Sequence, residues 1–251
     1  MVLCYHGVRS GFEPGISALP AGRLERQLDY FLARGFHPIA TDSNSNESTT
    51  LSVTLDDALT SQVDLWAGPL AERGLRATLF VPAGFVGRRA TCDYTGRHRR
   101  HAAWTQLAEW IGQGHAIGSH GMYHRDLRNL SQHELSSEVE GSKRLLEDRL
   151  GVAVESLSYP FGRFNSRVVQ VVRKAGYTHA FTARPDRTST DCFTRPRIVV
   201  SLFDTELSIE ARLQSSVWGG IERGKQRLIT FWSGGTALRQ IWIHRTENAA
   251  A

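Results

Sequence analysis

The sequence contains few cysteines that could cross-link the chain and no long apolar segment that could anchor it in a membrane. Its 3 cysteines, Cys4, Cys92 and Cys192, are far apart and include no CxxC pair. An odd number of widely spaced cysteines argues against a disulfide framework and against a cysteine zinc cluster. No apolar run approaches the roughly 20 residues of a membrane span, and no signal-peptide pattern opens the chain. We therefore expect a cytoplasmic protein with reduced thiols.

Lysine is also scarce. Lys143, Lys174 and Lys225 are the only lysines, so arginine supplies nearly all of the positive charge behind the net charge of +5. Compositional bias is one interpretation; the other is an anionic substrate, because arginine binds phosphate in a bidentate manner. No nucleic-acid-binding motif accompanies the charge, and we expect no nucleic-acid partner.

The sequence does contain a regular alternation of short apolar and amphipathic segments. Predicted strands cover 2–5, 51–55, 77–81, 116–118, 156–159 and 179–182, and predicted helices cover 21–34, 64–73, 104–111, 131–150, 166–174 and 205–218. Such alternation predicts a parallel sheet covered by helices. We expect an α/β fold, a distorted (β/α) barrel of about seven parallel strands, with an open doubly wound sheet as the alternative.

No linker or internal repeat divides the chain, and 251 residues suit one α/β barrel. We expect a single domain over 1–251, with its core at about 3–200. Residues 201–251 would form a partly irregular C-terminal extension, with a disordered end at 248–251.

Polar residues follow several predicted strands directly. Asp56 and Asp57 follow 51–55, His120 follows 116–118, and the turn at 159–162 ends another strand. The carboxyl ends of parallel strands converge on one site, so these groups are expected to meet.

The spacing of two histidines indicates a metal site. His120 and His124 are four residues apart and would face the same way on a helical turn. With Asp57 they would form a set of two imidazoles and one carboxylate that leaves room for water and substrate, as catalytic metal sites do. Asp56 would point away from Asp57, because neighbours on an extended segment alternate. It could therefore accept a proton while Asp57 binds the metal, whereas a helix N-cap would explain only one of the two.

Four segments resemble motifs of the polysaccharide deacetylases, carbohydrate esterase family 4. Residues 54–58 (TLDDA) are similar to the family's TFDDG, and 119–124 (SHGMYH) to its HxxxH motif. Residues 158–165 (SYPFGRFN) resemble its third motif in the YPYG form, and 5–8 (YHGV) its N-terminal YHxV. The motifs occur in the family's order between about residues 3 and 200. The resemblance implies a distorted (β/α) barrel and metal-dependent N-deacetylation.

The resemblance also implies roles for individual residues. Asp56 falls on the general base, and Asp57, His120 and His124 fall on the metal ligands. The metal, often zinc in this family and otherwise cobalt, nickel, iron or manganese, would act as a Lewis acid. The turn formed by Tyr159, Pro160, Phe161 and Gly162 would bind substrate, and the Phe161 N–H would stabilise the oxyanion.

The sequence departs from the family pattern in three places. Ala58 replaces a glycine that would permit a tight backbone. The third motif lacks the arginine that orients the base, and Arg197 could replace it. The general acid is open between His6 and His244, and we favour His6.

The basic loop at 87–101 is either a solvated loop or a lid in which Arg97, Arg99 or Arg100 meets an anionic group. The leading function is deacetylation of an N-acetylated sugar or sugar-containing metabolite, with a small molecule or oligosaccharide as substrate. A second hypothesis is hydrolysis of a non-sugar amide or cyclic imide on the same fold. A third is a binding protein that has lost catalysis.

Overall fold

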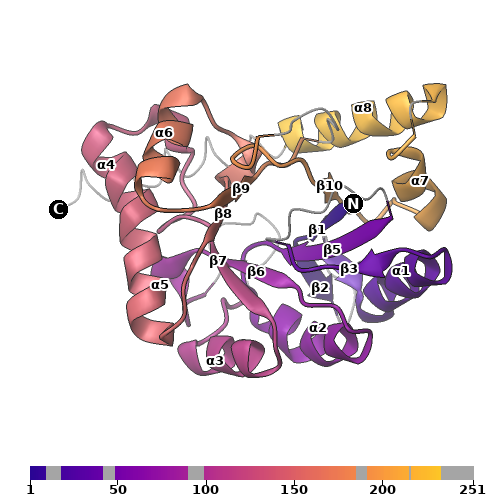
Figure 1. Ribbon diagram of the computed structural model, residues 1–251, viewed down its shortest axis with the longest axis horizontal. Coiled ribbons are helices and arrows are strands. Elements are labelled where there is room, and N and C mark those ends of the chain that lie inside the picture. Colours follow the sequence, from indigo (N-terminus) through magenta and orange to yellow (C-terminus); the bar gives the residue numbers. More distant parts are fainter. Residues whose placement is uncertain (10–17, 42–48, 90–98, 185–190, 215, 233–251) are drawn as a thin grey trace.

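A curled sheet of parallel strands forms the centre of the molecule (Figure 1). The structure, a computed structural model, describes residues 1–9, 18–41, 49–89, 99–184, 191–214 and 216–232. The strands follow one another in the order β10-β1-β5-β6-β7-β8-β9. In that order they span Ile198–Val199, Val2–Tyr5, Thr50–Leu55, Thr78–Val81, Ala116–Ser119, Ser156–Ser158 and His179–Phe181. The predicted distorted (β/α) barrel of seven parallel strands is confirmed as a curled half-barrel, and the open doubly wound sheet is not what forms.

Both faces of the central strands are covered, as is usual in a parallel sheet. Every residue of β5 and of β6 is buried. β1 pairs with β5 from Val2 opposite Ser52 to Tyr5 opposite Leu55, and β6 pairs with β7 along its whole length. These registers align the carboxyl ends of the strands, so the residues that follow them emerge at one edge of the sheet.

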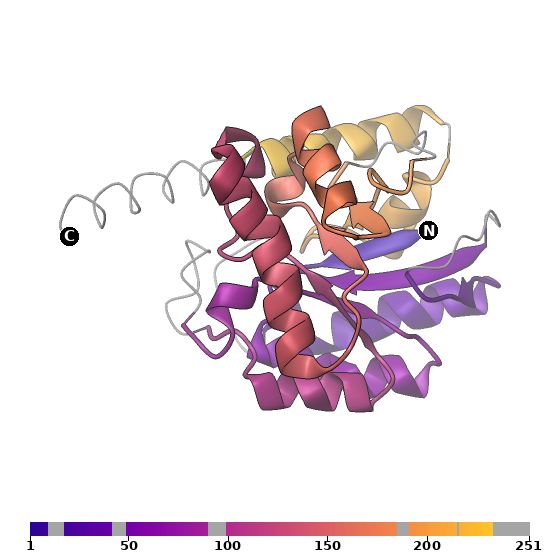
Figure 2. The same ribbon diagram turned by 60° about the vertical axis from the view of Figure 1, so that its left-hand side comes forward.

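Helices form the outer layer around the strands (Figures 1 and 2). They are α1 (Ala21–Ala33), α2 (Thr60–Glu72), α3 (Trp104–Gly112), α4 (Gln132–Ser136), α5 (Ser142–Leu150) and α6 (Ser166–Lys174). Leu24, Leu28 and Phe31 of α1 are fully buried, as their helical spacing predicts. Two short strands, β2 (Gly7–Arg9) and β3 (Ala18–Pro20), pair with each other, and β4 (His37–Pro38) pairs with β5.

The helix predicted over 131–150 forms, with one irregularity. A turn of π-helix, η3 (Ser137–Gly141), joins α4 to α5. The capping box that we predict at its start is present: Ser131 N–H donates to Glu134 Oε2 at 2.9 Å, and Glu134 N–H donates to Ser131 Oγ at 3.3 Å. The prediction for α2 is less accurate, because that helix begins four residues before 64. The Gln62 side chain accepts from Leu59 N–H at 2.7 Å and so stabilises the earlier start.

The single helix predicted over 205–218 is wrong. The chain forms α7 (Glu206–Ala211) and a separate α8 (Val217–Trp232). Gly219 lies against the end of α7 so closely that a Cβ there would be 2.4 Å from the carbonyl oxygens of Ala211 and Gln214. The chain therefore turns back on itself instead of continuing as one helix.

α8 lies beside the place where the sheet fails to close (Figure 1). β9 and β10 end the sheet on opposite sides. Gln226 Nε2 donates to Ala183 O at 3.0 Å and to Arg197 O at 3.1 Å, so α8 joins the segment after β9 to the segment before β10. The side chains of Val217, Trp218, Ile221 and Leu228 on the same helix are exposed.

Cys4 is buried and Cys192 is half-buried, and both are free thiols. Cys92, His244 and the predicted disordered end at 248–251 lie outside the described residues. Within the described part of the chain, no helix has the length and apolar character needed to cross a bilayer.

Candidate metal centre

Side chains from two strand ends and one loop meet at the carboxyl edge of the sheet. Asp57 follows β5, His120 follows β7, and His124 lies four residues further on. One ligand atom of each lies within 4.8 Å of the others. Asp57 Oδ1 is 3.8 Å from the Nε2 atoms of both His120 and His124. The structure thus brings together the three residues that the sequence predicts as metal ligands.

The backbone at this edge is strained. Among the described residues, the non-glycine residues with positive φ are Asp57 (74°), Ala58 (48°), His124 (53°) and Phe161 (58°). All four belong to the motifs singled out from the sequence, and residues in such conformations cluster at functional sites. Ala58 adopts the left-handed conformation that a glycine would adopt without strain, so the loop keeps the shape that glycine would permit.

The two histidines do not share a helical turn, contrary to the expectation from their spacing. Gly121 (φ 76°) and His124 (φ 53°) are both left-handed, which breaks a helix at this point. His120 projects from the end of β7 and His124 from the loop, and their ring centroids are 4.6 Å apart. The two histidines that the spacing singles out therefore come together for a geometric reason that differs from the one we expected.

One hydrogen bond orients His120. Its Nδ1 lies 2.8 Å from the carbonyl oxygen of Ser158, which can only accept, so Nδ1 carries the proton. Nε2 then keeps its lone pair and faces Asp57. Metal-binding histidines are commonly fixed in this way through their other ring nitrogen.

Glu138 in η3 holds the loop between the histidines. Its Oε2 accepts from Met122 N–H at 2.8 Å and from Tyr123 N–H at 3.0 Å. Glu138 is 2% exposed, and burial raises the pKa of its carboxyl. Glu138 belongs to none of the sequence motifs, although a charged side chain between Leu135 and Val139 on the buried stripe of a helix is a detectable signal.

His101 supports the loop after β5. Its Nδ1 lies 2.7 Å from Asp57 O, and Ala102 N–H donates to Ala58 O at 2.7 Å. The His101 ring stacks on Phe85 with centroids 5.4 Å apart. No sequence motif indicates this role, because His101 ends a loop without periodicity.

The protonation states suit a bound cation. Burial outweighs the nearby Asp56 carboxylate and lowers the pKa of both His120 and His124 to about 4. Neutral imidazoles with a free lone pair are the form that binds metals. With the Asp57 carboxylate, these rings offer the mixed nitrogen and oxygen donor set of a divalent transition metal.

Asp56 lies beside this cluster in a buried ion pair. Arg197 Nη1 and Nη2 donate to its two carboxylate oxygens at 2.7 and 2.8 Å, and both side chains are at most 3% exposed. Ser158 Oγ donates to Asp56 Oδ2 at 3.1 Å and accepts from Arg197 Nη2 at 2.7 Å. Burial alone would raise the pKa of Asp56, but Arg197 and the nearby histidines outweigh it and hold the pKa well below its usual range. Asp56 is therefore ionised.

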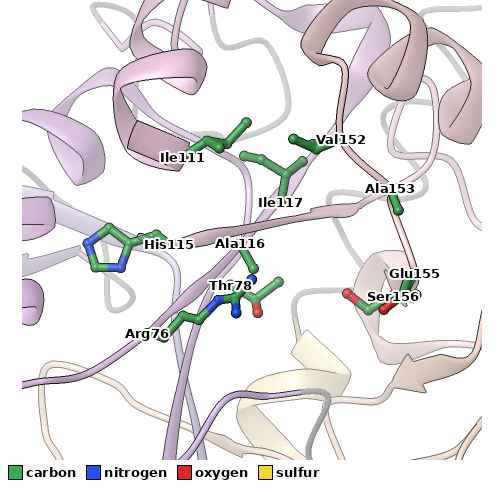
Figure 3. Close-up of a pocket in the computed structure, with 10 residues that line it drawn as sticks. All are labelled: Arg76, Thr78, Ile111, His115, Ala116, Ile117, Val152, Ala153, Glu155 and Ser156. Atoms are coloured by element: carbon green, nitrogen blue, oxygen red, sulfur yellow. The ribbon is translucent and has the colours of Figure 1, made fainter. Parts of the chain in front are cut away.

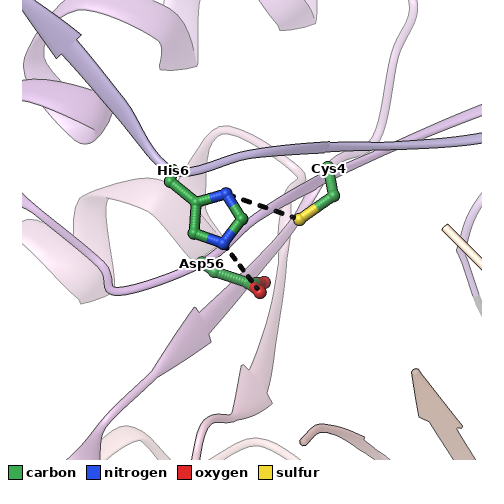
Figure 4. Close-up of side chains that lie close together, drawn as sticks. All are labelled: Cys4, His6 and Asp56. Atoms are coloured by element: carbon green, nitrogen blue, oxygen red, sulfur yellow. Dashed lines mark hydrogen bonds and ion pairs between the residues drawn. The ribbon is translucent and has the colours of Figure 1, made fainter. Parts of the chain in front are cut away.

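His6 lies between Cys4 and Asp56 (Figure 4). Its Nδ1 is 4.0 Å from Cys4 Sγ, and its Nε2 is 3.8 Å from Asp56 Oδ2. Burial opposes charging of the ring, but the Cys4 sulfur and the Asp56 and Asp57 carboxylates raise the pKa of His6 to about 10. These three side chains also lie close enough together to bind one metal ion, with a ligand atom of each within 4.8 Å of the others. However, Cys4 and Asp56 face different nitrogens of one ring, and Arg197 already neutralises Asp56, so the cluster suits a proton better than a cation.

The predicted substrate-binding turn is mostly buried. Tyr159, Pro160 and Gly162 are buried, and Tyr159 Oη donates to Phe193 O at 2.9 Å. Phe161 is half-buried, and its ring centroid is 4.5 Å from that of His124. Within the turn, Phe161 can contact a substrate directly, while the other three residues shape the backbone. Their role in binding stays a prediction.

The basic loop is only partly described. Arg97 lies outside the described residues, and Arg100 Nη1 donates to Gly87 O at 3.2 Å. A contact of Arg97, Arg99 or Arg100 with an anionic substrate also stays a prediction.

A separate hollow lies at the other end of the strands (Figure 3). Thr78, Ala116 and Ser156, the first residues of β6, β7 and β8, line it. None of the residues around the metal cluster takes part in its lining.

The fold and the site together define an α/β half-barrel with an Asp–His–His cluster and a buried carboxylate at its carboxyl edge. The sequence pattern of the family "Polysaccharide deacetylase" matches residues 43–180, more than half of the chain. The protein belongs to the polysaccharide deacetylase family, whose members are hydrolases acting on amide bonds.

Individual relatives agree with this assignment. The chain is 25% identical over 199 residues to YxkH of Bacillus subtilis (strain 168), itself named as a polysaccharide deacetylase, covering 76% of this chain and 66% of YxkH. Among solved structures, the Streptococcus pyogenes deacetylase PplD in complex with acetate has a TM-score of 0.73 at 16% identity, covering 85% of this chain and 97% of PplD. IcaB from Ammonifex degensii has a TM-score of 0.69 at 21% identity, covering 90% and 96%. At these identities, the solved structures show the shared fold.

Proposed function

We propose that the protein is a metal-dependent N-deacetylase that hydrolyses the acetamide of an N-acetylated sugar. The observation that carries the proposal is the Asp57, His120 and His124 cluster next to an ionised, buried Asp56. The acetate bound to PplD, a protein of the same fold, is consistent with acetate as a product.

Asp57, His120 and His124 would hold a divalent cation. Zinc suits two imidazoles and one carboxylate, and cobalt, nickel, iron or manganese could take its place. Three protein ligands leave open positions, so a bound metal would supply Lewis acidity and a more acidic water.

Asp56 would act as the general base. It is ionised because Arg197 binds both of its oxygens, and Ser158 fixes its orientation. A carboxylate held in this way can take a proton from a water molecule that attacks the amide carbon. Arg197, which donates to both oxygens of Asp56, would act through that carboxylate as a positioning residue.

His6 would donate the proton to the departing amine. Its side chain is 29% exposed and its pKa of about 10 keeps it charged at neutral pH. The Nε2–H that faces Asp56 is the proton available for transfer, and the N–H of Phe161 is our candidate donor to the oxyanion. The alternative acid, His244, lies outside the described residues.

The test compares metal content and acetate release from N-acetylglucosamine oligomers for the wild-type protein and Asp57→Asn. Asp148→Asn is the matched control, because Asp148 is an exposed carboxylate on α5. We expect Asp57→Asn to lose both bound metal and acetate release, and Asp148→Asn to lose neither.

Full activity of Asp57→Asn would contradict the proposal. A wild-type protein that binds metal but hydrolyses only non-sugar amides or cyclic imides would favour the second hypothesis. Failure of the wild-type protein to bind zinc would favour the third hypothesis, a binding protein without catalysis.

A further inference from the structure

Tyr123 is exposed although it lies between two buried histidines. Its relative exposure is 40%, whereas His120 and His124 are 2% and 7% exposed. A large aromatic side chain that remains in solvent loses the free energy that burial would provide. An exposed aromatic ring that adjoins a predicted metal ligand along the chain is a candidate contact for a ligand, since aromatic rings combine a large apolar face with a polar edge.

The Tyr123 ring is held in place from one side. Gly84, in η1 (Ala83–Phe85), lies so close that a Cβ on it would be 2.4 Å from Tyr123 Cε1. The Phe85 ring meets the Tyr123 ring edge-on, with centroids 5.7 Å apart and an interplanar angle of 64°. The backbone is fixed as well, since Tyr123 N–H donates to Glu138 at 3.0 Å and Gly84 N–H donates to Met122 O at 2.8 Å. The ring is thus fixed before any ligand arrives, and part of it faces solvent.

The same contacts connect Tyr123 to the metal cluster. Tyr123 is bonded to His124 along the chain. Phe85 stacks on His101, and His101 Nδ1 lies 2.7 Å from the carbonyl oxygen of Asp57. A side chain joined to two of the three ligands in this way keeps a constant distance from the reacting centre, as substrate recognition requires.

We propose that Tyr123 is a stacking platform for a pyranose ring of the substrate, and this inference rests on the proposed function. The C–H groups on one face of a pyranose are apolar and lie flat on an aromatic ring, while its hydroxyl groups remain in water at the edge. A sugar ring placed there would position its acetamide, or that of a neighbouring ring, at the metal cluster. Tyr123 would then select a carbohydrate over a small acyl compound of equal reactivity.

The experiment measures steady-state kinetics of the zinc-loaded full chain on two substrates. One is an oligomer of N-acetylglucosamine, and the other is 4-nitrophenyl acetate, which has no sugar ring. The variants are Tyr123→Ala, which removes the ring, and Tyr123→Phe, which keeps it. Trp218→Ala on α8 is the matched control, because Trp218 is another exposed aromatic residue, with 52% exposure.

For Tyr123→Ala we expect KM for the oligomer to rise about tenfold with kcat retained, the size of effect that one aromatic contact supports. Turnover of 4-nitrophenyl acetate should stay within about twofold of wild type, because the metal ligands and the base are intact. Tyr123→Phe should keep the wild-type KM for the oligomer, and Trp218→Ala should change KM and kcat for neither substrate.

Two results would overturn the platform while the proposed function survives. One is an unchanged oligomer KM in Tyr123→Ala, and the other is an equal loss on both substrates, which indicates damage to the loop instead of lost stacking. If the wild-type protein releases acetate from no sugar, the proposed function fails and the platform fails with it.

Discussion

Replacing Arg197 by methionine should destabilise the folded protein mainly through the carboxylate that it leaves behind. Arg197 is 1% exposed and donates to both oxygens of Asp56, to Ser158, to Thr54 and to Thr182. Removing one partner of a buried ion pair costs about 3–5 kcal/mol, because an uncompensated charge stays buried. That loss is a large fraction of the about 5–15 kcal/mol by which most domains are stable.

The cost should depend on pH, with a sign that follows from Asp56. In the wild type the pKa of Asp56 is lowered. The ion pair therefore contributes stability above the unfolded pKa of about 3.9, and this contribution is lost as the pH falls through the folded value. In Arg197→Met, His6 at 3.8 Å is the remaining cation beside Asp56, so burial raises the pKa of Asp56 relative to the wild type and the penalty grows as the pH rises from about 4 towards 7.

The assay is urea-induced unfolding of chelator-treated protein at several pH values. Arg73→Met is the matched control, because Arg73 also binds both oxygens of an aspartate, Asp29, at 2.7 and 3.0 Å, but the Asp29 side chain is 59% exposed. Solvent screening limits such a pair to about 1 kcal/mol or less. The double variant Asp56→Asn/Arg197→Met should recover part of the loss, since it removes both charges. A deficit for Arg197→Met that matches that of Arg73→Met, or one that does not change with pH, would refute this reasoning.

Three further outcomes are expected. Glu138→Ala should cost about 1–3 kcal/mol in urea unfolding and weaken zinc binding in a metal titration, because the N–H groups of Met122 and Tyr123 lose their acceptor. Glu138→Gln, which keeps an acceptor oxygen, should lose less, and equal losses would count against the hydrogen bonds. Ala58→Gly should raise the stability by up to about 1 kcal/mol in thermal unfolding, because relief of the left-handed strain exceeds the entropic cost of glycine; a lower Tm would show that the conformation is not strained. Zinc at about 100 times its Kd should stabilise the wild type by about 2.7 kcal/mol, seen as a higher Tm, while Asp57→Asn should gain little; an equal gain would place the ion elsewhere.

The sequence predicts the strands and the cluster well because both depend on local, repeating signals. Apolar runs that end in polar residues identify β5 and β7, and parallel strands must bring their ends to one edge. Asp56 and Asp57, His120 and His124 are therefore expected to meet before any coordinates are known. Arg197 is 141 residues away from Asp56 along the chain. Only the missing arginine of the third motif points to it, since no local rule identifies such a partner.

The contacts that position the site residues are harder to predict from the sequence. His101 reaches Asp57 O from a loop without periodicity, and its role depends on how that loop crosses the sheet edge. The interpretation of the histidine spacing as a helical turn was wrong because Gly121 and His124 adopt positive φ. The division of 205–218 into two helices depends on the packing of Gly219 against Ala211, which helical periodicity does not encode.

The position of α8 beside the open side of the sheet limits how far this chain can be shortened. The family pattern ends at residue 180, but Gln226 joins the carbonyl oxygens of Ala183 and Arg197 across the open side of the sheet. Arg212, which forms a buried ion pair with Asp204, also forms an ion pair with Glu222 of the same helix. A chain cut near residue 200 would keep every motif residue yet lose the support of the segment that carries Arg197. We therefore expect the smallest unit that folds with the Asp56–Arg197 ion pair in place to extend through α8, beyond the residues that the family pattern matches.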